Sequence, residues 1–425
     1  MTPRNRVFSG LFAGLSVAFA GACGTTSEPR GEAGAAGATG VAGSAGNPAH
    51  SGGSGGSPAG GAATGGNAGN STPSAGTGGN AGVSGGVSGG SAGTSSTEGG
   101  ASNGGTSSVG SGGNAPSAGA GGLAPSGLEV DILPDYDNAK SNTNGIAGFI
   151  TRTGVVPHLV SNYMNVNGGS FSTSQAQSFV DEALAAGVKH IAISLATSDT
   201  DVSSAAQAQI AAAVSYGAQK AVSVQIRFGY EMNGNWSPSY HGGDFSIFKN
   251  TWAKVASAVH GAGGLMVWAP NVDGGGQNAY RAVLPDDHST IDIVGLDFYH
   301  FNSSETNLTL GSGEVDKAFA GIYPLVKELN KPFVLTETAV SYFVTSGAWP
   351  TASSDEIAEK QAWLEQLTSS TLLVKYPLYR GFAWFDYNKH ESDQFRDFSI
   401  SQQPAEATMF SNWVTQNRAR LDLGG

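Results

Sequence analysis

The sequence contains little cysteine and little positive charge. Cys23 is the only cysteine among 425 residues, so no disulfide can form within the chain. Lysine and arginine number 21 against 33 aspartates and glutamates, and the formal net charge is −12. This balance, with no basic cluster to offset it, argues against nucleic acid or an anionic surface as a partner. A neutral partner is the better expectation.

The motifs of several common chemistries are also missing. The eight histidines are scattered, without the HExxH spacing or a cysteine partner, so we predict no metal site. From residue 127 on, beyond a glycine-rich stretch, the sequence has no GxSxG elbow, no Walker loop and no dinucleotide fingerprint. We therefore predict that the protein needs no cofactor.

The N-terminal residues have the pattern of an export signal. Arg4 and Arg6 precede an apolar or small stretch at residues 7–20, which is too short to span a bilayer comfortably. Cys23 follows directly after Ala22, and this arrangement resembles a bacterial lipoprotein signal. The resemblance implies export through the Sec pathway, removal of residues 1–22, and a cell-surface or outer-membrane location held only by a lipid on Cys23. The alternative is cleavage after Ala22 with a free thiol, which would give a soluble extracellular protein.

Residues 23–126 are predicted to form a disordered linker. Of the chain's 64 glycines, 35 lie between residues 24 and 126, and this stretch has no Phe, Trp or Tyr. Without large apolar side chains it cannot bury a core. As a Gly-rich coil it would extend roughly 50 to 60 Å in root-mean-square terms. A tether behind a lipid anchor is the simplest use, and a low-complexity insert with no spacing role is the alternative.

Residues 127–425 hold every aromatic residue beyond the signal and are predicted to form one domain, most simply a monomer. Helical periodicity at Phe248, Trp252, Val255 and Val259 is one of several helix signals, and a weaker one lies near residues 146–152. These helices alternate with eight candidate strands. The alternation favours an α/β fold, a single (β/α)8 TIM barrel. The strands are predicted at residues 128–133, 155–163, 190–195, 222–228, 265–269, 293–298, 333–336 and 381–385.

Acidic residues stand at the ends of four predicted strands: Glu231, Asp297, Glu337 and Asp386. Barrel enzymes build their sites at these C-terminal strand ends. For Asp386 a solvated loop acid is an equal alternative, whereas Glu337 lies inside the apolar stretch PFVLTETAV. Two carboxylates on opposite walls of a barrel mouth are what glycoside hydrolysis needs.

Five segments of the sequence resemble, in order, the signature segments of glycoside hydrolase family 26. They are RFGYEMNGNW, VWAPNVD, VGLDFYH, KPFVLTETA and GFAWFDYNK. The resemblance implies a retaining mechanism with Glu231 as the general acid/base and Glu337 as the nucleophile. It implies further roles in the substrate site for Arg227, Tyr230, Asp297 and Tyr299, and for two aromatic platforms, Trp236 and Trp384. Arg227 as a buried ion-pair partner and Trp384 as a core aromatic are the alternatives.

Tyr230 departs from the family pattern, because the family usually has histidine directly before the acid/base. A phenol still donates and accepts a hydrogen bond, but it is longer and not cationic, so the sugar site is reshaped. The family acts on β-1,4-mannan, β-1,3-xylan or mixed-linkage β-glucan, and the sequence does not choose among these neutral polysaccharides. A surface protein that binds carbohydrate on the same barrel without cleaving it is the alternative to an endo-acting β-glycanase.

Overall fold

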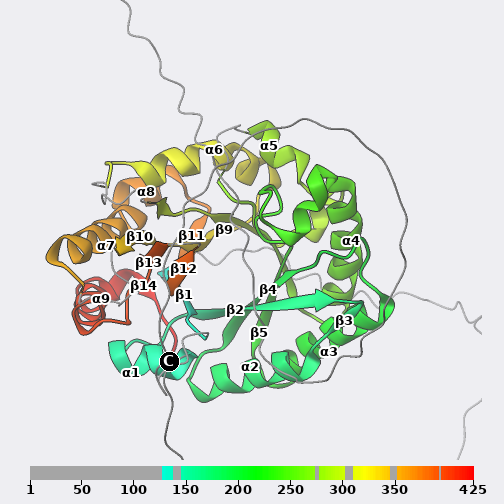
Figure 1. Ribbon diagram of the computed structural model, residues 1–425, viewed down its shortest axis with the longest axis horizontal. Coiled ribbons are helices and arrows are strands. Elements are labelled where there is room, and N and C mark those ends of the chain that lie inside the picture. Colours follow the sequence, from blue (N-terminus) through cyan, green and yellow to red (C-terminus); the bar gives the residue numbers. More distant parts are fainter. Residues whose placement is uncertain (1–126, 137–144, 273–276, 302–309, 345–351, 392–393) are drawn as a thin grey trace, which may run out of the picture. The chain divides into compact units, whose positions relative to one another are not determined.

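The computed structural model describes residues 127–136, 145–272, 277–301, 310–344, 352–391 and 394–425 (Figure 1). The predicted signal and linker, including Cys23, lie outside these residues. Within the described ranges, no helix combines the length and apolar character needed to cross a membrane.

Eight parallel strands form the wall of a closed barrel in the described part of the chain (Figure 1). Closure occurs at β1, which pairs in parallel with β2 through Ile132 and Val160, and with β11 from Glu129 to Pro134. The predicted (β/α)8 barrel is therefore confirmed. The strands are β1 (Leu128–Pro134), β2 (Leu159–Asn167), β4 (His190–Ala196), β5 (Ser223–Phe228), β6 (Leu265–Trp268), β7 (Ile293–Asp297), β9 (Phe333–Thr338) and β11 (Tyr379–Asp386).

Helices surround these strands, as Figure 1 shows. The apolar stripe of α4 explains its position, because Phe248, Trp252, Val255 and Val259 are all at most 1% exposed. The weak signal near residue 146 corresponds to a real helix, α1. The helices are α1 (Gly145–Thr153), α2 (Thr173–Ala185), α3 (Ser204–Gln219), α4 (Phe245–Gly261), α5 (Gln277–Ala282), α6 (Glu314–Leu329), α7 (Ser354–Leu367), α8 (Ser370–Lys375) and α9 (Pro404–Asn417), with 3-10 turns at Pro238–Gly243, His288–Thr290 and Arg418–Arg420.

A second, smaller sheet was not predicted from the sequence. It has the order β12-β13-β10-β8, and three of its strands follow β7, β9 and β11 almost directly. The chain therefore continues in extended form beyond these barrel strands. The remaining strands are β3 (Ser170–Phe171), β8 (His300–Phe301), β10 (Val340–Val344), β12 (Asn388–Glu391), β13 (Gln394–Asp397) and β14 (Leu421–Asp422).

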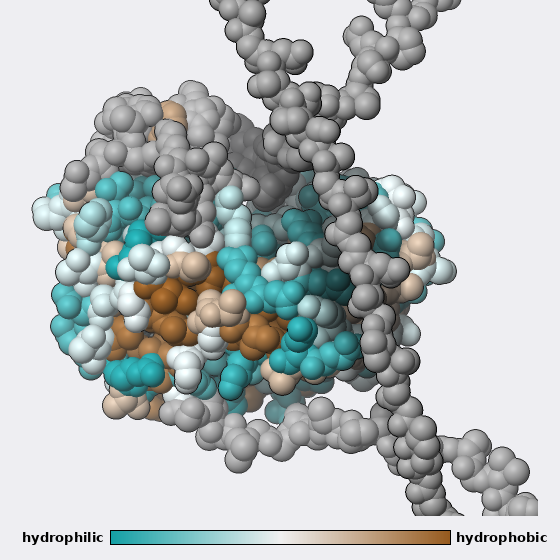
Figure 2. All heavy atoms as spheres, turned by 90° about the horizontal axis from the view of Figure 1, so that it is seen from below, coloured by the Kyte–Doolittle hydropathy of each residue, from teal (hydrophilic) through white to brown (hydrophobic). Residues whose placement is uncertain are grey.

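The described surface leaves few large hydrophobic side chains open to solvent. Figure 2 shows one face of the molecule, where hydrophobic residues lie among hydrophilic ones. Among the described residues only Leu184, at 39%, and Val374, at 82%, are large hydrophobics classed as exposed. Single exposed residues of this kind are normal in globular proteins and indicate no interaction surface.

Candidate active site

The turn after β5 presents Glu231 in a strained conformation. Gly229 has φ 68°, and a Cβ there would lie 2.6 Å from the Phe248 ring. Glu231 itself has φ 52°, in the left-handed region that costs a residue with a side chain on the order of 1 kcal/mol or more. Its backbone N–H donates to Ala269 O at 2.9 Å, which ties the turn to β6. The fold thus holds this acid in a conformation that it would not adopt by itself.

The residues after Glu231 explain why the EMNGNW motif has this composition. Asn233 binds the backbone of Asn271 twice, accepting from its N–H at 2.8 Å and donating to its carbonyl at 2.9 Å. Gly234 leaves room for Trp236, whose indole carbons would lie 2.4 Å from a Cβ there. Asn233 and Gly234 are therefore positioning residues.

Two donors that this motif positions reach the Glu231 carboxylate. The Trp236 indole N–H donates to Oε2 at 2.6 Å, and the Asn271 side-chain amide donates to Oε1. Burial and the nearby charge of Glu337 raise the pKa of Glu231, while these two hydrogen bonds oppose the shift. A carboxyl group with a raised pKa is suited to donate a proton near neutral pH.

Glu337, on β9, is 4% exposed and lies among three donors. The Tyr163 hydroxyl donates to Oε1 at 2.5 Å, and the Tyr299 hydroxyl donates to Oε2 at 2.6 Å. The Arg227 guanidinium also donates to Oε1 in a direct ion pair. An ionised carboxylate is an acceptor only, and this arrangement offers it donors on both oxygens.

Arg227 joins the carboxylates of Glu337 and Asp297 beneath the site. It is 2% exposed, its Nη1 is 2.9 Å from Asp297 Oδ1, and its Nε donates to Ser194 Oγ at 2.9 Å. Asp297 also accepts from the Thr336 hydroxyl at 2.6 Å. Arg227 thus forms buried ion pairs, which was the alternative to a role in the substrate site. One of its two acids is Glu337, the predicted nucleophile.

Tyr230 lies beside this group, with its ring centroid 5.1 Å from the Arg227 guanidinium and 5.2 Å from the Tyr163 ring. Within the described ranges, no residue hydrogen-bonds its hydroxyl. Tyr230, which departs from the family pattern, therefore lies beside the donors that surround Glu337. Among the described residues nothing occupies its hydroxyl, which could bind another partner.

In the described ranges, no hydrogen bond or ion pair joins the predicted residues of the eighth barrel strand to this group. Trp384 has no exposed surface, and its indole N–H donates to Phe398 O at 2.8 Å. This matches the alternative of a core aromatic, and we assign Trp384 no sugar contact. Asp386 is also fully buried and accepts from the backbone N–H groups of Ile400 and Ser401, at 2.8 and 3.0 Å. It orders the segment before α9.

Four residues of the site were not identified from the sequence. Tyr163 and Asn271 contact the two glutamates directly, and Ser194 holds Arg227. Phe385 lies edge-on to the Tyr299 ring at 5.8 Å, next to the position predicted for the platform. Tyr163 is the last residue of the predicted strand at residues 155–163, and this position was an available signal, because residues at the ends of neighbouring parallel strands meet at one end of a barrel.

The fold and site together define a (β/α)8 barrel with two glutamates on different strand ends, each held by its own set of donors. No protein-family profile matches the sequence, and no curated protein does either. Solved structures do share the fold. The catalytic domain of the GH26 endo-β-1,4-mannanase from Bacillus sp. JAMB-750 aligns with TM-score 0.50 and 14% identity, over 71% of this chain and 88% of that one.

Two further solved structures align at lower scores. GH26C from a Muricauda species has TM-score 0.48 and 18% identity, over 70% of this chain and 87% of that one. A double mutant of the Cellulomonas fimi endo-β-1,4-mannanase has TM-score 0.47 and 14% identity, over 70% and 72%. The alignment with TM-score 0.50 makes the barrel structurally similar to a mannanase of glycoside hydrolase family 26, and at 14% identity the similarity concerns the fold.

Proposed function

We propose that this protein is a retaining endo-β-glycanase with Glu337 as nucleophile and Glu231 as general acid/base. The observation that carries the proposal is the contrast between the two carboxyl groups. Glu337 accepts from two phenols and a guanidinium, whereas burial and the charge of Glu337 raise the pKa of Glu231. A carboxylate held by three donors is suited to the role of nucleophile, and a carboxyl group with a raised pKa is suited to the role of acid.

The chemistry follows two displacements. In the first, a Glu337 oxygen attacks the anomeric carbon while Glu231 gives its proton to the glycosidic oxygen, and the bond to the leaving group breaks. In the second, Glu231 takes a proton from water, whose oxygen attacks the same carbon and releases Glu337. One water is consumed, and the configuration is retained. The Tyr163, Tyr299 and Arg227 donors hold the nucleophile in place throughout.

The proposed substrate is a neutral β-linked polysaccharide: β-1,4-mannan, β-1,3-xylan or mixed-linkage β-glucan. The acidic net charge fits a neutral substrate better than an anionic one. Tyr230 would contact the sugar nearest the nucleophile through its hydroxyl, which no described residue binds, and the half-buried Trp236 would pack against a neighbouring ring.

Release of reducing ends from these three polysaccharides tests the proposal. We expect wild-type protein to cleave at least one of them, and Glu337→Gln to bind that polysaccharide without cleaving it. Binding by the wild type without product on all three would overturn the enzyme proposal. That result would favour the carbohydrate-binding alternative, with Tyr230 as the residue to examine first.

We also propose that the barrel is exported and held at the cell surface by a lipid on Cys23. The support is the signal pattern and the position of the chain's only cysteine. Cys23→Ser should move the protein from the membrane fraction to the soluble fraction, measured by fractionation of the expressing cells. A variant that stays with the membrane would contradict lipid anchoring and favour an uncleaved signal helix.

A further inference from the structure

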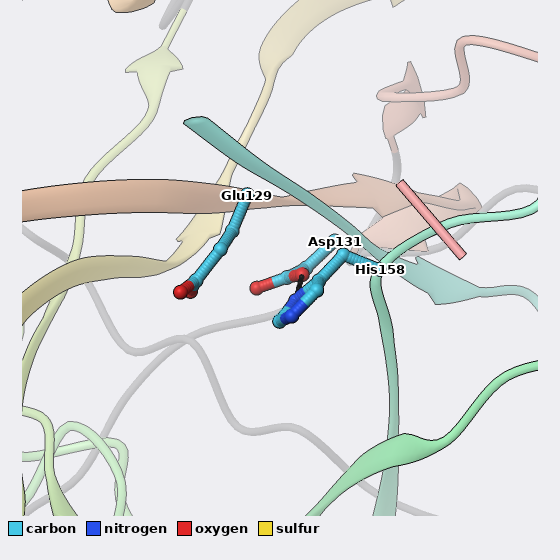
Figure 3. Close-up of side chains that lie close together, drawn as sticks. All are labelled: Glu129, Asp131 and His158. Atoms are coloured by element: carbon cyan, nitrogen blue, oxygen red, sulfur yellow. Dashed lines mark hydrogen bonds and ion pairs between the residues drawn. The ribbon is translucent and has the colours of Figure 1, made fainter. Parts of the chain in front are cut away.

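Glu129, Asp131 and His158 bring three metal-ligating groups together inside the barrel. Glu129 and Asp131 project from the first half of β1, and His158 directly precedes β2. One ligand atom from each lies within 4.8 Å of the other two. Figure 3 shows the two carboxylates and the imidazole side by side. The group lies at the starts of the strands, whereas the proposed active site lies at their ends.

The spacing of these atoms is already close to that of ligands on one ion. His158 Nδ1 and Asp131 Oδ1 are 3.1 Å apart. Two ligands that each lie about 2.0 to 2.1 Å from a tetrahedral zinc are about 3.3 to 3.4 Å apart. Asp131 is 3% exposed and fixed within β1, and a Glu129 carboxylate oxygen lies within 4.8 Å of both other ligand atoms.

The third ligand is the Glu129 carboxylate. No residue in the described ranges donates a hydrogen bond or forms an ion pair with its carboxylate. Glu129 and Asp131 also line a cavity of about 20 Å³ inside the barrel, which exceeds the roughly 10 to 15 Å³ that one water needs. A fourth, solvent ligand therefore has room beside the two carboxylates.

The charges around the group are of both signs, and His158 itself pairs with Asp131. Asp422 adds negative charge, and Arg380 and Lys189 oppose it. The His190 ring stacks on His158 at 4.5 Å and 18° and so fixes the plane of the imidazole.

We propose that Glu129, Asp131 and His158 form a zinc site that ties the start of β2 to β1. One imidazole with two carboxylates is a donor set that zinc accepts, whereas calcium takes oxygen ligands only. The prediction of no metal site rested on motif spacing along the chain. That reasoning misses a site whose ligands lie 27 residues apart and meet only when β1 and β2 pair.

Isothermal titration of the full-length, chelator-treated protein with zinc chloride tests this site. We expect zinc to bind wild type and to raise its thermal midpoint. Glu129→Gln, which is nearly isosteric, should weaken the binding about 100-fold or more, because it removes a ligand and not merely an outer partner. His158→Gln should do the same, and it keeps the test decisive if one variant fails to fold.

His260→Gln is the matched control. His260 pairs with Asp292 at 2.8 Å in a partly exposed position, and neither residue belongs to a three-residue ligand group in the described ranges. It should bind zinc as wild type does. No zinc binding by wild type, or equal binding by wild type, Glu129→Gln and His158→Gln, would overturn the proposal. Neither result bears on the glycanase proposal, since the readout is binding and not turnover.

Discussion

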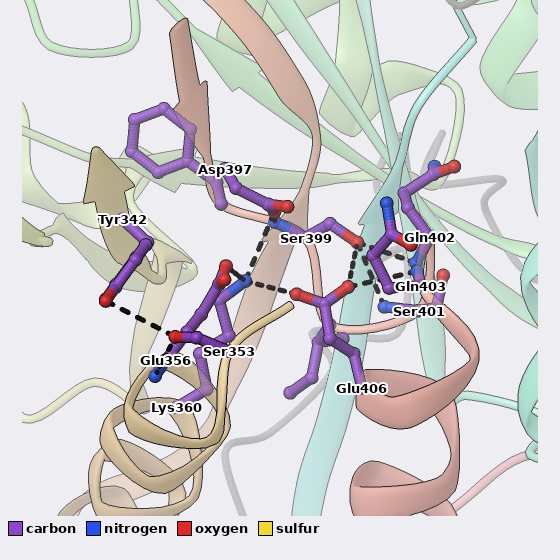
Figure 4. A network of polar contacts seen from close by, with 12 residues as sticks. Tyr342, Ser353, Glu356, Lys360, Asp397, Ser399, Ser401, Gln402, Gln403 and Glu406 are labelled. Atoms are coloured by element: carbon purple, nitrogen blue, oxygen red, sulfur yellow. Dashed lines mark hydrogen bonds and ion pairs between the residues drawn. The ribbon is translucent and has the colours of Figure 1, made fainter. Parts of the chain in front are cut away.

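Two regions of this molecule each place one buried cation among carboxylates, and only one of them has the features of a catalytic site. The Lys360 cluster joins α7, β13 and α9: the Lys360 ammonium contacts Glu356 at 2.8 Å, Asp397 at 3.1 Å and Glu406 (Figure 4). The Arg227 centre, defined by Arg227, Asp297 and Glu337, is similarly buried. Buried charge by itself therefore does not distinguish the two.

The two regions differ in whether polar groups lack hydrogen-bond partners and whether the backbone is strained. In the Lys360 cluster, Ser399 and the Gln403 backbone also donate to the acids, and the cation fills the position between the three carboxylates. Beside the Arg227 centre lie an acid with positive φ, Glu231, and a phenol hydroxyl that no described residue binds, that of Tyr230. Strain and open polar groups mark the proposed active site, whereas a closed network marks a structural cluster.

The largest expected effect is a loss of turnover at the Arg227 centre without a matching loss of stability. Glu337→Gln removes the nucleophile, so turnover should fall roughly 10⁵-fold, the scale seen when a covalent nucleophile is lost. The thermal midpoint should stay near that of wild type, because the amide keeps the shape of the side chain. Steady-state kinetics and thermal unfolding measure both, and turnover within tenfold of wild type would contradict the assignment.

The opposite result is expected in the Lys360 cluster. Lys360→Met leaves three buried carboxylates without their cation and should lower the free energy of unfolding by about 3 to 5 kcal/mol. Urea denaturation measures the loss, and kcat of the protein that remains folded should stay near wild type. Lys254→Met, which breaks an exposed pair with Asp201, is the control and should behave as wild type. An unchanged midpoint for Lys360→Met would contradict a structural role.

Tyr163→Phe tests the donor that the sequence did not reveal. Removing one hydrogen bond to a charged group costs about 1.5 to 3 kcal/mol, so kcat should fall about 10- to 100-fold with little change in KM. Tyr216→Phe removes a comparable 2.9 Å hydrogen bond to the exposed Asp181 and should leave kcat unchanged. A loss confined to KM would show that Tyr163 binds substrate and does not position Glu337.

The smallest effect concerns the pH dependence set by Glu231. The Asn271 amide stabilises the charged form of Glu231, so Asn271→Ala should raise the pKa of Glu231 further. Glu231 must be protonated to act as the acid, and activity is lost as pH rises through its pKa. The basic limb of the kcat/KM profile should therefore move to higher pH in the variant, and a limb that moves to lower pH would contradict this role.

The barrel could be predicted because its signals are local. The eight strands and the stripe of α4 follow from apolar periodicity within single segments, and the two glutamates follow from motifs at strand ends. The Lys360 cluster could not be predicted in this way. Glu356 and Lys360 stand at i and i+4 on α7, a spacing typical of exposed helix pairs, yet both are at most 3% exposed. Only the packing of α9 and β13 against α7 buries them.

The contacts of Tyr163 and Trp384 could not be predicted from the sequence for a related reason. Both are aromatic residues inside strands, and periodicity alone does not say which face a strand turns toward the barrel interior. The pairing of β11 with β1 and β9 sets this orientation, and it buries Trp384 against Phe398 while Phe385 meets Tyr299. Neighbouring residues of β11 therefore point to opposite faces. Trp384, which was predicted for the site, lies in the core, and Phe385 packs beside the site.

The most direct test of the central claim uses Glu231→Ala with an activated aryl β-glycoside and azide. The departing phenolate barely needs a proton, so the first displacement should still occur and form the glycosyl-enzyme on Glu337. Azide should then enter the space left by the Glu231 carboxyl and attack the anomeric carbon. The account predicts a β-glycosyl azide, identified by NMR. An α-glycosyl azide from this variant would show that Glu231 is itself the nucleophile and would contradict the assignment.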